Sequence, residues 1–207
     1  MASELARNYD ELYRDSAIAF GTGGPYQLVA TAASAMTGTK VLELGAGEGR
    51  NAVYLARRGF DVTAIDISAI GLRKLRTALG AHGLTAQTQV GDIREIVLTD
   101  SFDLVVTTFV LHHLPVADGV AVLRRMQEHT VIGGMNVVAA YGNSGDLAAL
   151  EGDHDLYYPA PGDIHQLYSG WEIIEYDEAE AQPALQKDDG SSMVNAVTRV
   201  LARRVNP

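Results

Sequence analysis

The stretch Lys40-Val-Leu-Glu-Leu-Gly-Ala-Gly-Glu-Gly49 decides the fold class of this chain of 207 residues. A short apolar strand, Lys40–Leu44, leads directly into a glycine-rich turn, and a helical pattern follows from about Arg50 to Arg58. A strand, a glycine turn and a helix in this order let a backbone approach a nucleotide-like ligand. The stretch therefore predicts an α/β fold with a ligand crevice at the end of its first strand.

The rest of the chain alternates apolar strands with helical segments, which favours a mainly parallel sheet. Further strands are expected at Asp61–Asp66, Thr85–Val90, Asp103–Phe109, Met135–Tyr141, Trp171–Tyr176 and Met193–Ala202. Helices are expected from Ser3, as a cap, through Tyr13, and at Tyr26–Met36, Ala69–Ala81 (capped by Ser68), Ala117–His129 and Asp163–Tyr168. Gly142–Gly162 is expected to be a long loop. Because no clear helix separates the last two strands, one of them should run antiparallel. Trp171 is expected in the core.

Composition narrows the function classes. Lys and Arg number 16 against 26 Asp and Glu, a net charge of −10 that repels phosphate backbones and argues against a nucleic-acid partner. No clearly apolar stretch reaches the roughly 18 residues of a membrane span, so no membrane association is expected. The chain has no cysteine, which excludes disulfides and thiolate catalysis and favours a cytoplasmic location.

Acidic residues stand at the ends of the first three predicted strands. Glu43 precedes the glycine turn, where a carboxylate repels pyrophosphate and suits a cationic ligand. Asp66 ends the second strand, where a carboxylate accepts hydrogen bonds from both ribose hydroxyls. Asp92 follows the third strand and can accept from an adenine amino group while Ile93 packs on the ring. Together they predict a pocket for a positively charged adenosine without phosphates.

The whole pattern resembles the class I S-adenosylmethionine-dependent methyltransferases from about Lys40 to the C-terminus. The resemblance is carried by Val41–Gly49, Asp66, Gly91-Asp92-Ile93, Phe102–Val105 and Gly133-Gly134. Within this class the chain is most similar to the tellurite-resistance methyltransferase family, through Gly47–Ala56, Gly59–Val62, Asp66, Tyr168–Glu172, Tyr176 and Val200–Arg203. The resemblance implies one Rossmann-like domain over residues 1–207, with a seven-stranded, mainly parallel sheet of order 3-2-1-4-5-7-6, strand seven antiparallel, and helices on both faces.

The resemblance also implies a cofactor and a set of site residues. The cofactor is S-adenosyl-L-methionine, and the product S-adenosyl-L-homocysteine. The cofactor-binding residues it implies are Glu43, Gly45, Ala46, Gly47, Arg50, Asn51, Asp66, Ile67, Asp92, Ile93, Thr108 and Phe109. No metal site is expected. Residues 1–24 and 142–165 are expected to form a lid.

His112 and His113 are the catalytic candidates, because they follow the fourth strand and histidine takes up protons near neutral pH. They are expected to line the pocket of the methyl acceptor, with one as a base, or to pack as structural hydrogen-bonding residues. Tellurite-acting relatives carry a His-Arg pair and a further Arg between the last two strands. Here the chain has Leu185-Gln186-Lys187-Asp188-Asp189 and Met193, a departure that argues against an oxyanion substrate.

Three functional readings remain open from the sequence. The first is an enzyme, monomeric or homodimeric, that transfers a methyl group by in-line displacement to a small-molecule acceptor: a metabolite, a natural product or a soft inorganic nucleophile. The second is a non-catalytic sensor or scaffold that binds S-adenosylmethionine. The third is a nicotinamide-dependent reductase, against which the acid at Glu43 and the missing sixth glycine of the dinucleotide motif, replaced by Arg50, both argue.

Overall fold

The computed structural model describes residues 4–16, 24–151, 155–181 and 190–206, which divide into two compact units, Met1–Val106 and Thr107–Pro207. Seven strands form one sheet in the order β3-β2-β1-β4-β5-β7-β6, each hydrogen-bonded to its neighbours. The strands are β1 (Lys40–Leu44), β2 (Asp61–Asp66), β3 (Gln87–Val90), β4 (Phe102–Thr108), β5 (Thr130–Gly145), β6 (Glu172–Ala181) and β7 (Asn195–Arg203). The expected strand order is confirmed.

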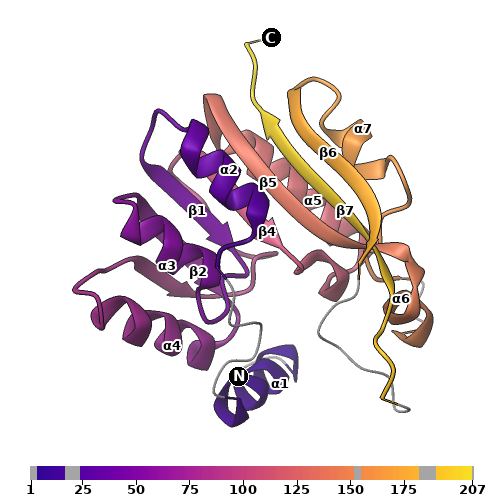
Figure 1. Cartoon of the computed structure of the whole chain (residues 1–207), viewed down its shortest axis with the longest axis horizontal. Coiled ribbons are helices and arrows are strands. Elements are labelled where there is room, and N and C mark those ends of the chain that lie inside the picture. Colours follow the sequence, from indigo (N-terminus) through magenta and orange to yellow (C-terminus); the bar gives the residue numbers. More distant parts are fainter. Residues whose placement is uncertain (1–3, 17–23, 152–154, 182–189, 207) are drawn as a thin grey trace. The chain divides into compact units, whose positions relative to one another are not determined.

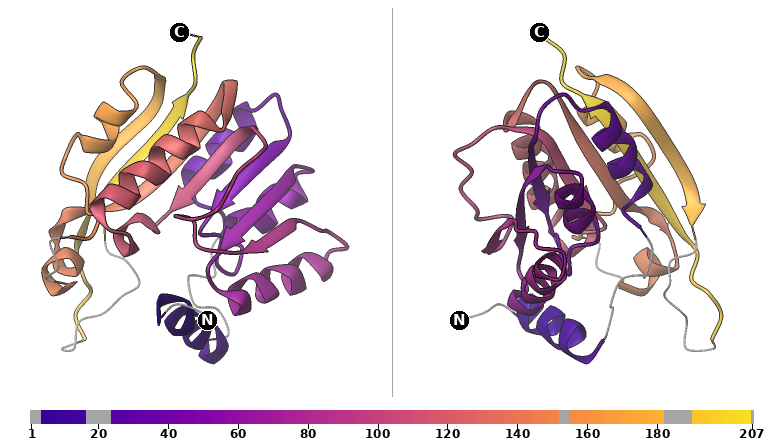
Figure 2. Two further views of the ribbon diagram at one scale, coloured as in Figure 1. Left: turned by 180° about the vertical axis from the view of Figure 1, so that it is seen from behind. Right: turned by 60° about the vertical axis from the view of Figure 1, so that its left-hand side comes forward.

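The first unit is built around the parallel strands β1, β2 and β3. Its helices are α1 (Glu4–Asp15), α2 (Gln27–Ala35), α3 (Arg50–Arg57) and α4 (Ala69–Gly80). In Figures 1 and 2, α2 and α3 lie over the same face of β1 and β2, and α3 and α4 contact each other and β2. β3 begins at Gln87 rather than at the expected Thr85, because its pairing with β2 starts only there.

Apolar runs explain why this unit folds as it does. Val41, Leu42 and Leu44 on β1 are fully buried, because a strand in the middle of a sheet needs apolar side chains along its whole length. Ser68 caps α4 as expected: its hydroxyl accepts a hydrogen bond from the Gly71 N–H at 3.0 Å. The glycine turn between β1 and α3 is thereby held between a buried strand and well-formed helices.

The second unit is an antiparallel ribbon of β5, β7 and β6 with helices beside it. β7 pairs antiparallel with both β5 and β6, which confirms the expected reversal of strand seven. Its helices are the 3₁₀ turn η1 (Leu111–His113), α5 (Val116–Glu128), α6 (Asp146–Glu151) and α7 (Asp163–Leu167). α5 contacts β5, and Figure 2 shows it along one face of the ribbon.

The expected loop Gly142–Gly162 is wrong in its first half. β5 continues to Gly145 and α6 follows at once, because β7 supplies partners that turn-forming residues cannot find locally. The side chain of Asn195 accepts from the Leu147 N–H at 2.7 Å, and Asp146 accepts from the Val194 N–H at 2.8 Å. Tertiary pairing therefore overrides the local preference of this glycine-rich stretch.

Other expectations differ or lie outside the described residues. Trp171 is half-buried rather than in the core, because it precedes β6, the last strand in the sheet order. The cap at Ser3 and the segment 185–189 are outside the described residues. Among the helices in the described part of the chain, none has the length and apolar character needed to cross a bilayer.

Candidate active site

The glycine turn after β1 is fastened to the end of β2. The backbone N–H groups of Gly45 and Ala46 both donate to the Ile65 carbonyl, at 2.8 and 3.0 Å. Gly49 has a φ of 90° and precedes α3, a left-handed conformation that a glycine adopts without strain. The turn therefore presents its backbone close to the ends of β1 and β2, as the sequence predicts.

Glu43 is a buried carboxylate at this turn, only 2% exposed. Its Oε1 accepts a hydrogen bond from the Asn51 amide at 2.8 Å, whereas its Oε2 is buried and has no hydrogen-bond partner. Burial raises the pKa of Glu43 to about 7, although Asn51 and the charge of Arg50 pull it down. A buried carboxylate with an unused oxygen is complementary to a cationic ligand group.

The side chain of Asn51 is buried and forms a hydrogen bond with Glu43. Its Nδ2 donates to Glu43, and its Oδ1 accepts from the Tyr26 N–H at 2.8 Å, at the start of α2. The side chain is 2% exposed. Arg50 lies next to it in the chain, with its guanidinium 5.9 Å from the ring centre of Tyr26. The structure thus places Asn51 as a link between α2 and the acid of the turn.

Asp66 closes the second side of the site. Its Oδ2 accepts from the Gly47 N–H at 2.7 Å, and its Oδ1 accepts from the Ser68 N–H at 2.8 Å. Burial raises the pKa of Asp66, and these two backbone hydrogen bonds oppose the rise. A carboxylate oxygen accepts more than one hydrogen bond, so the side chain both braces the turn and keeps capacity for a ligand.

Helix α1 packs on this turn, a contact that involves both lid and turn residues. A Cβ at Gly47, which has a φ of 55°, would collide with the hydroxyl of Tyr13. Tyr13 is 4% exposed, and burial together with the nearby Asp66 carboxylate raises its pKa. The side chain of Tyr13 therefore lies directly on the backbone of Gly47, beside the acidic residues of the turn.

Asp10 anchors the same helix, and nothing in the sequence pattern singled it out. Its carboxylate accepts from the Ser68 hydroxyl at 2.5 Å and from the Ile70 N–H at 3.0 Å, at the N-terminus of α4. The Lys74 ammonium donates to the Ser16 carbonyl at 2.6 Å. Free backbone N–H groups at a helix N-terminus attract a carboxylate, and this is why Asp10 binds the start of α4. That attraction is the signal that could have pointed to Asp10.

Asp92 is already engaged by a neighbour. Arg94 forms a fork on it, with its Nε 3.0 Å from both oxygens and its Nη2 2.6 Å from Oδ2. This arginine lowers the pKa of Asp92. Ile93 is buried and Ile67 is half-buried. The predicted contact of Asp92 with adenine would share its oxygens with this ion pair.

The second unit brings the remaining predicted residues into a group of rings at the end of β4. Phe109 packs against Tyr141 with ring centres 4.9 Å apart, and His112 lies 5.0 Å from Tyr141. The two histidine rings are 3.8 Å apart, and His112 is also 5.9 Å from Tyr158. Thr108, the last residue of β4, is half-buried.

Both histidines are held neutral. Burial lowers the pKa of His112 to about 3, helped by His113, and lowers that of His113 to about 4. The Nδ1 of His112 is buried and has no hydrogen-bond partner. Such imidazoles are weak bases, so this environment favours a neutral side chain that accepts a hydrogen bond over one that stores a proton.

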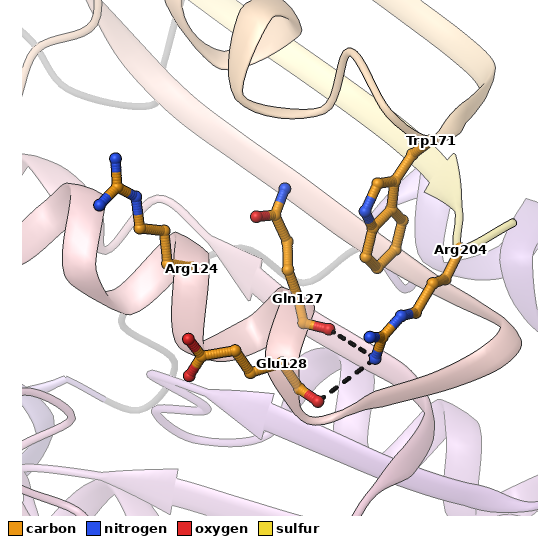
Figure 3. A pocket seen from close by; sticks show the side chains of 5 residues that line it. All are labelled: Arg124, Gln127, Glu128, Trp171 and Arg204. Carbon is orange, nitrogen blue, oxygen red and sulfur yellow. Dashed lines mark hydrogen bonds between the residues drawn. The ribbon is translucent and has the colours of Figure 1, made fainter. Parts of the chain in front are cut away.

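A pocket of about 310 Å³ lies elsewhere on the second unit and contains none of the predicted site residues. Figure 3 shows Arg204 turned toward the end of α5 beside Trp171. The Arg204 guanidinium donates to the carbonyls of Gln127 at 3.1 Å, of Glu128 at 3.3 Å and of Thr130. The carbonyls of Gln127 and Glu128 are at the C-terminal end of α5, where they need such donors, and Thr130 is the first residue of β5. The guanidinium of Arg204 therefore stabilises the fold, and these contacts explain its position without a ligand.

Comparison with known proteins gives consistent matches. The family described as "Tellurite resistance protein TehB" matches residues 20–196. A probable S-adenosyl-L-methionine-dependent methyltransferase TehB of Haemophilus influenzae (strain 10810) is 29% identical over 183 residues, which are 85% of this chain and 61% of that protein. The crystal structure of TehB from Haemophilus influenzae has 26% identity and a TM-score of 0.78, over 96% of this chain and 66% of that one.

A more distant match concerns the fold alone. The N-methyltransferase NodS from Bradyrhizobium japonicum WM9, in complex with S-adenosyl-l-homocysteine, has 16% identity and a TM-score of 0.74, over 99% of this chain and all (100%) of that one. The chain thus spans a little under two thirds of the length of the TehB proteins that it matches.

Proposed function

Because the chain belongs to the TehB tellurite resistance protein family, we propose that it is an S-adenosylmethionine-dependent methyltransferase acting on a small-molecule acceptor. The observation that carries the proposal is the unpartnered, fully buried Oε2 of Glu43 beside the glycine turn. An ionised carboxylate is costly in such a place unless a cation joins it. S-adenosylmethionine carries an ammonium and a sulfonium group and no phosphate, which fits this set of residues.

The residues of the turn would hold the cofactor in distinct ways. The backbone of Gly45, Ala46 and Gly47 permits close approach, and Glu43 supplies the negative charge. Asp66 binds the ribose hydroxyls while it braces Gly47. When bound, the cofactor supplies a methyl group already activated on sulfur, so the protein mainly has to align the acceptor and exclude water.

Helix α1 forms part of a lid over this turn. The support is its packing: Tyr13 covers Gly47, and Asp10 docks on the start of α4. Opening of α1 would expose the turn, and closing would bury it behind an aromatic ring. The other expected lid segment, 142–165, contributes Tyr158 to the rings around His112.

His112 and His113 line the acceptor side. They directly follow β4, the neighbour of β1 in the sheet order. Their low basicity supports a neutral hydrogen-bond acceptor that orients the substrate and takes its proton only after methylation has made that proton strongly acidic. With the cofactor bound, its methyl group would pass from sulfur to the acceptor atom, and the acceptor's proton would go to an imidazole nitrogen of His112 or His113 or to solvent.

Two measurements test the proposal. Calorimetry should show that the full chain binds S-adenosylmethionine and S-adenosylhomocysteine and does not bind NADH. An acceptor screen that detects S-adenosylhomocysteine should then show turnover. Tight binding of NADH in place of the sulfonium compound would refute the cofactor assignment, whereas binding without turnover across the screen, with slow release, would favour the sensor or scaffold.

A further inference from the structure

The rings around His112 form a compact group, of which only Phe109 is among the predicted cofactor-binding residues. Phe109, His112, His113, Tyr141 and Tyr158 come from four segments: the end of β4, η1, β5 and the chain after α6. Successive ring centres lie between 3.8 and 5.9 Å apart. We call these five residues the ring cluster. Edge and tilted contacts of this kind give aromatic residues a specific mutual geometry.

Backbone strain is present at the same place. Phe109 has a φ of 57°, and it is the one non-glycine residue with a positive φ in the described part of the chain. Its N–H donates to the Ala139 carbonyl at 2.7 Å, which holds the strained turn in place. A bulky residue in this conformation is strained and persists where the surrounding structure forces it, often at functional sites.

An unsatisfied nitrogen lies within the ring cluster. The Nδ1 of His112 is buried without a partner, and the residue is 5% exposed. A buried polar atom without a hydrogen bond destabilises the folded protein, because it has lost its bonds to water. The strained backbone of Phe109 and the unpaired Nδ1 of His112 therefore belong to the same group of rings, with Tyr141 between them. A ligand with a hydrogen-bond donor would give this nitrogen the hydrogen bond that it lacks.

The charge of the ring cluster narrows the kind of ligand. None of its five side chains carries a charge near neutral pH, since both imidazoles are neutral. Three described arginines of the same unit are engaged elsewhere: Arg199 pairs with Asp177, Arg203 pairs with Glu172, and Arg204 binds helix carbonyls. A site built of neutral rings offers little to an oxyanion and much to a flat, uncharged compound.

We propose that the ring cluster is the acceptor subsite and that it takes an uncharged aromatic compound with an O–H or N–H donor, such as a phenol, positioned by His112. This inference rests on the proposed function. It names the substrate class by chemistry: aromatic stacking gives affinity, and the donor meets the free imidazole nitrogen. An oxyanion such as tellurite would find no compensating charge among these rings.

Binding to the chain saturated with S-adenosylhomocysteine tests this without any turnover. Ligand-observed NMR titrations compare phenol with anisole, which lacks the donor, with cyclohexanol, which lacks the ring, and with benzoate and tellurite, which are anions. Phenol should bind about three- to tenfold more tightly than each of the others, as expected for one ring contact or one hydrogen bond. Stronger binding of benzoate or tellurite, or equal binding of cyclohexanol, would overturn the proposal.

Variants localise the effect. Phe109→Gly removes a ring at a position whose φ suits glycine, and Tyr158→Ala removes a half-buried ring. Each should weaken phenol binding about three- to tenfold. Tyr158→Ala, at a residue outside the predicted cofactor site, should also leave affinity for S-adenosylmethionine unchanged. His112→Phe keeps a ring and should abolish the preference for phenol over anisole. The matched control Tyr176→Ala, on β6, should change neither affinity.

Cofactor binding tests the proposed function, and phenol binding tests the role of the ring cluster. Loss of cofactor binding by the unaltered chain would defeat the proposed function, whatever phenol does. Normal cofactor binding with phenol affinity insensitive to Phe109→Gly, Tyr158→Ala and His112→Phe would defeat the ring cluster alone.

Discussion

Replacing Glu43 with glutamine should stabilise the unliganded protein and weaken cofactor binding at the same time. Glutamine has nearly the same shape, and its Oε1 can keep the hydrogen bond from Asn51. It removes the charge that burial opposes. The variant therefore separates the electrostatic cost of this residue from its packing.

The magnitude follows from the pKa of Glu43, which rises from its ordinary 4.5 to about 7 in the folded protein. An acid with a raised folded-state pKa binds more protons when folded, so it costs stability as the pH rises through this window. A shift of about two and a half units corresponds to about 3 kcal/mol when the residue is fully ionised. Near pH 5 less than about 1 kcal/mol of that cost has accrued.

Thermal unfolding of both proteins at several pH values measures the effect. The stability advantage of Glu43→Gln should grow by about 2 kcal/mol between pH 5 and pH 8, a shift of roughly 4–8 °C in Tm for a chain of this size. S-adenosylmethionine should raise the Tm of the unaltered protein more than that of the variant, and its binding near pH 7 should release protons from Glu43. An advantage that does not change with pH would refute the electrostatic reasoning.

Three further changes test the same site and one structural cation. Asp66→Asn removes charge-assisted hydrogen bonds to Gly47 and Ser68, so calorimetry should show cofactor binding weakened by roughly 1–3 kcal/mol; unchanged affinity would remove Asp66 from the site. Gly47→Ala should clash with Tyr13, undock α1 and weaken cofactor binding, and the undocking should appear as faster protease cleavage near residue 16. Adding Tyr13→Ala removes the clash and should recover part of the cofactor binding. Arg204→Ala should cost about 1–3 kcal/mol of stability in a denaturant titration and leave cofactor affinity intact, because its donors meet helix carbonyls; a loss of affinity would contradict this role.

Much of the fold was predictable because its signals are local. The buried run of β1, the glycine turn and the cap at Ser68 each depend on residues close together in the chain. The strand order came from the family resemblance, and the acids Glu43 and Asp66 came from their places at strand ends. Local sequence therefore predicted most of the elements and pointed to the two acids beside the glycine turn.

Tertiary structure decided what depends on partners distant in the chain. β5 continues past Tyr141 because, after a shift of register, Gly145 pairs with Asn195 on β7. Asp10 matters because α1 docks on α4. The raised pKa of Glu43 and the lowered pKa of His112 arise from burial, which depends on packing against residues elsewhere in the chain. Hydrogen-bond partners and desolvation are properties of the packed chain, so only the three-dimensional arrangement set the charge states of these two side chains.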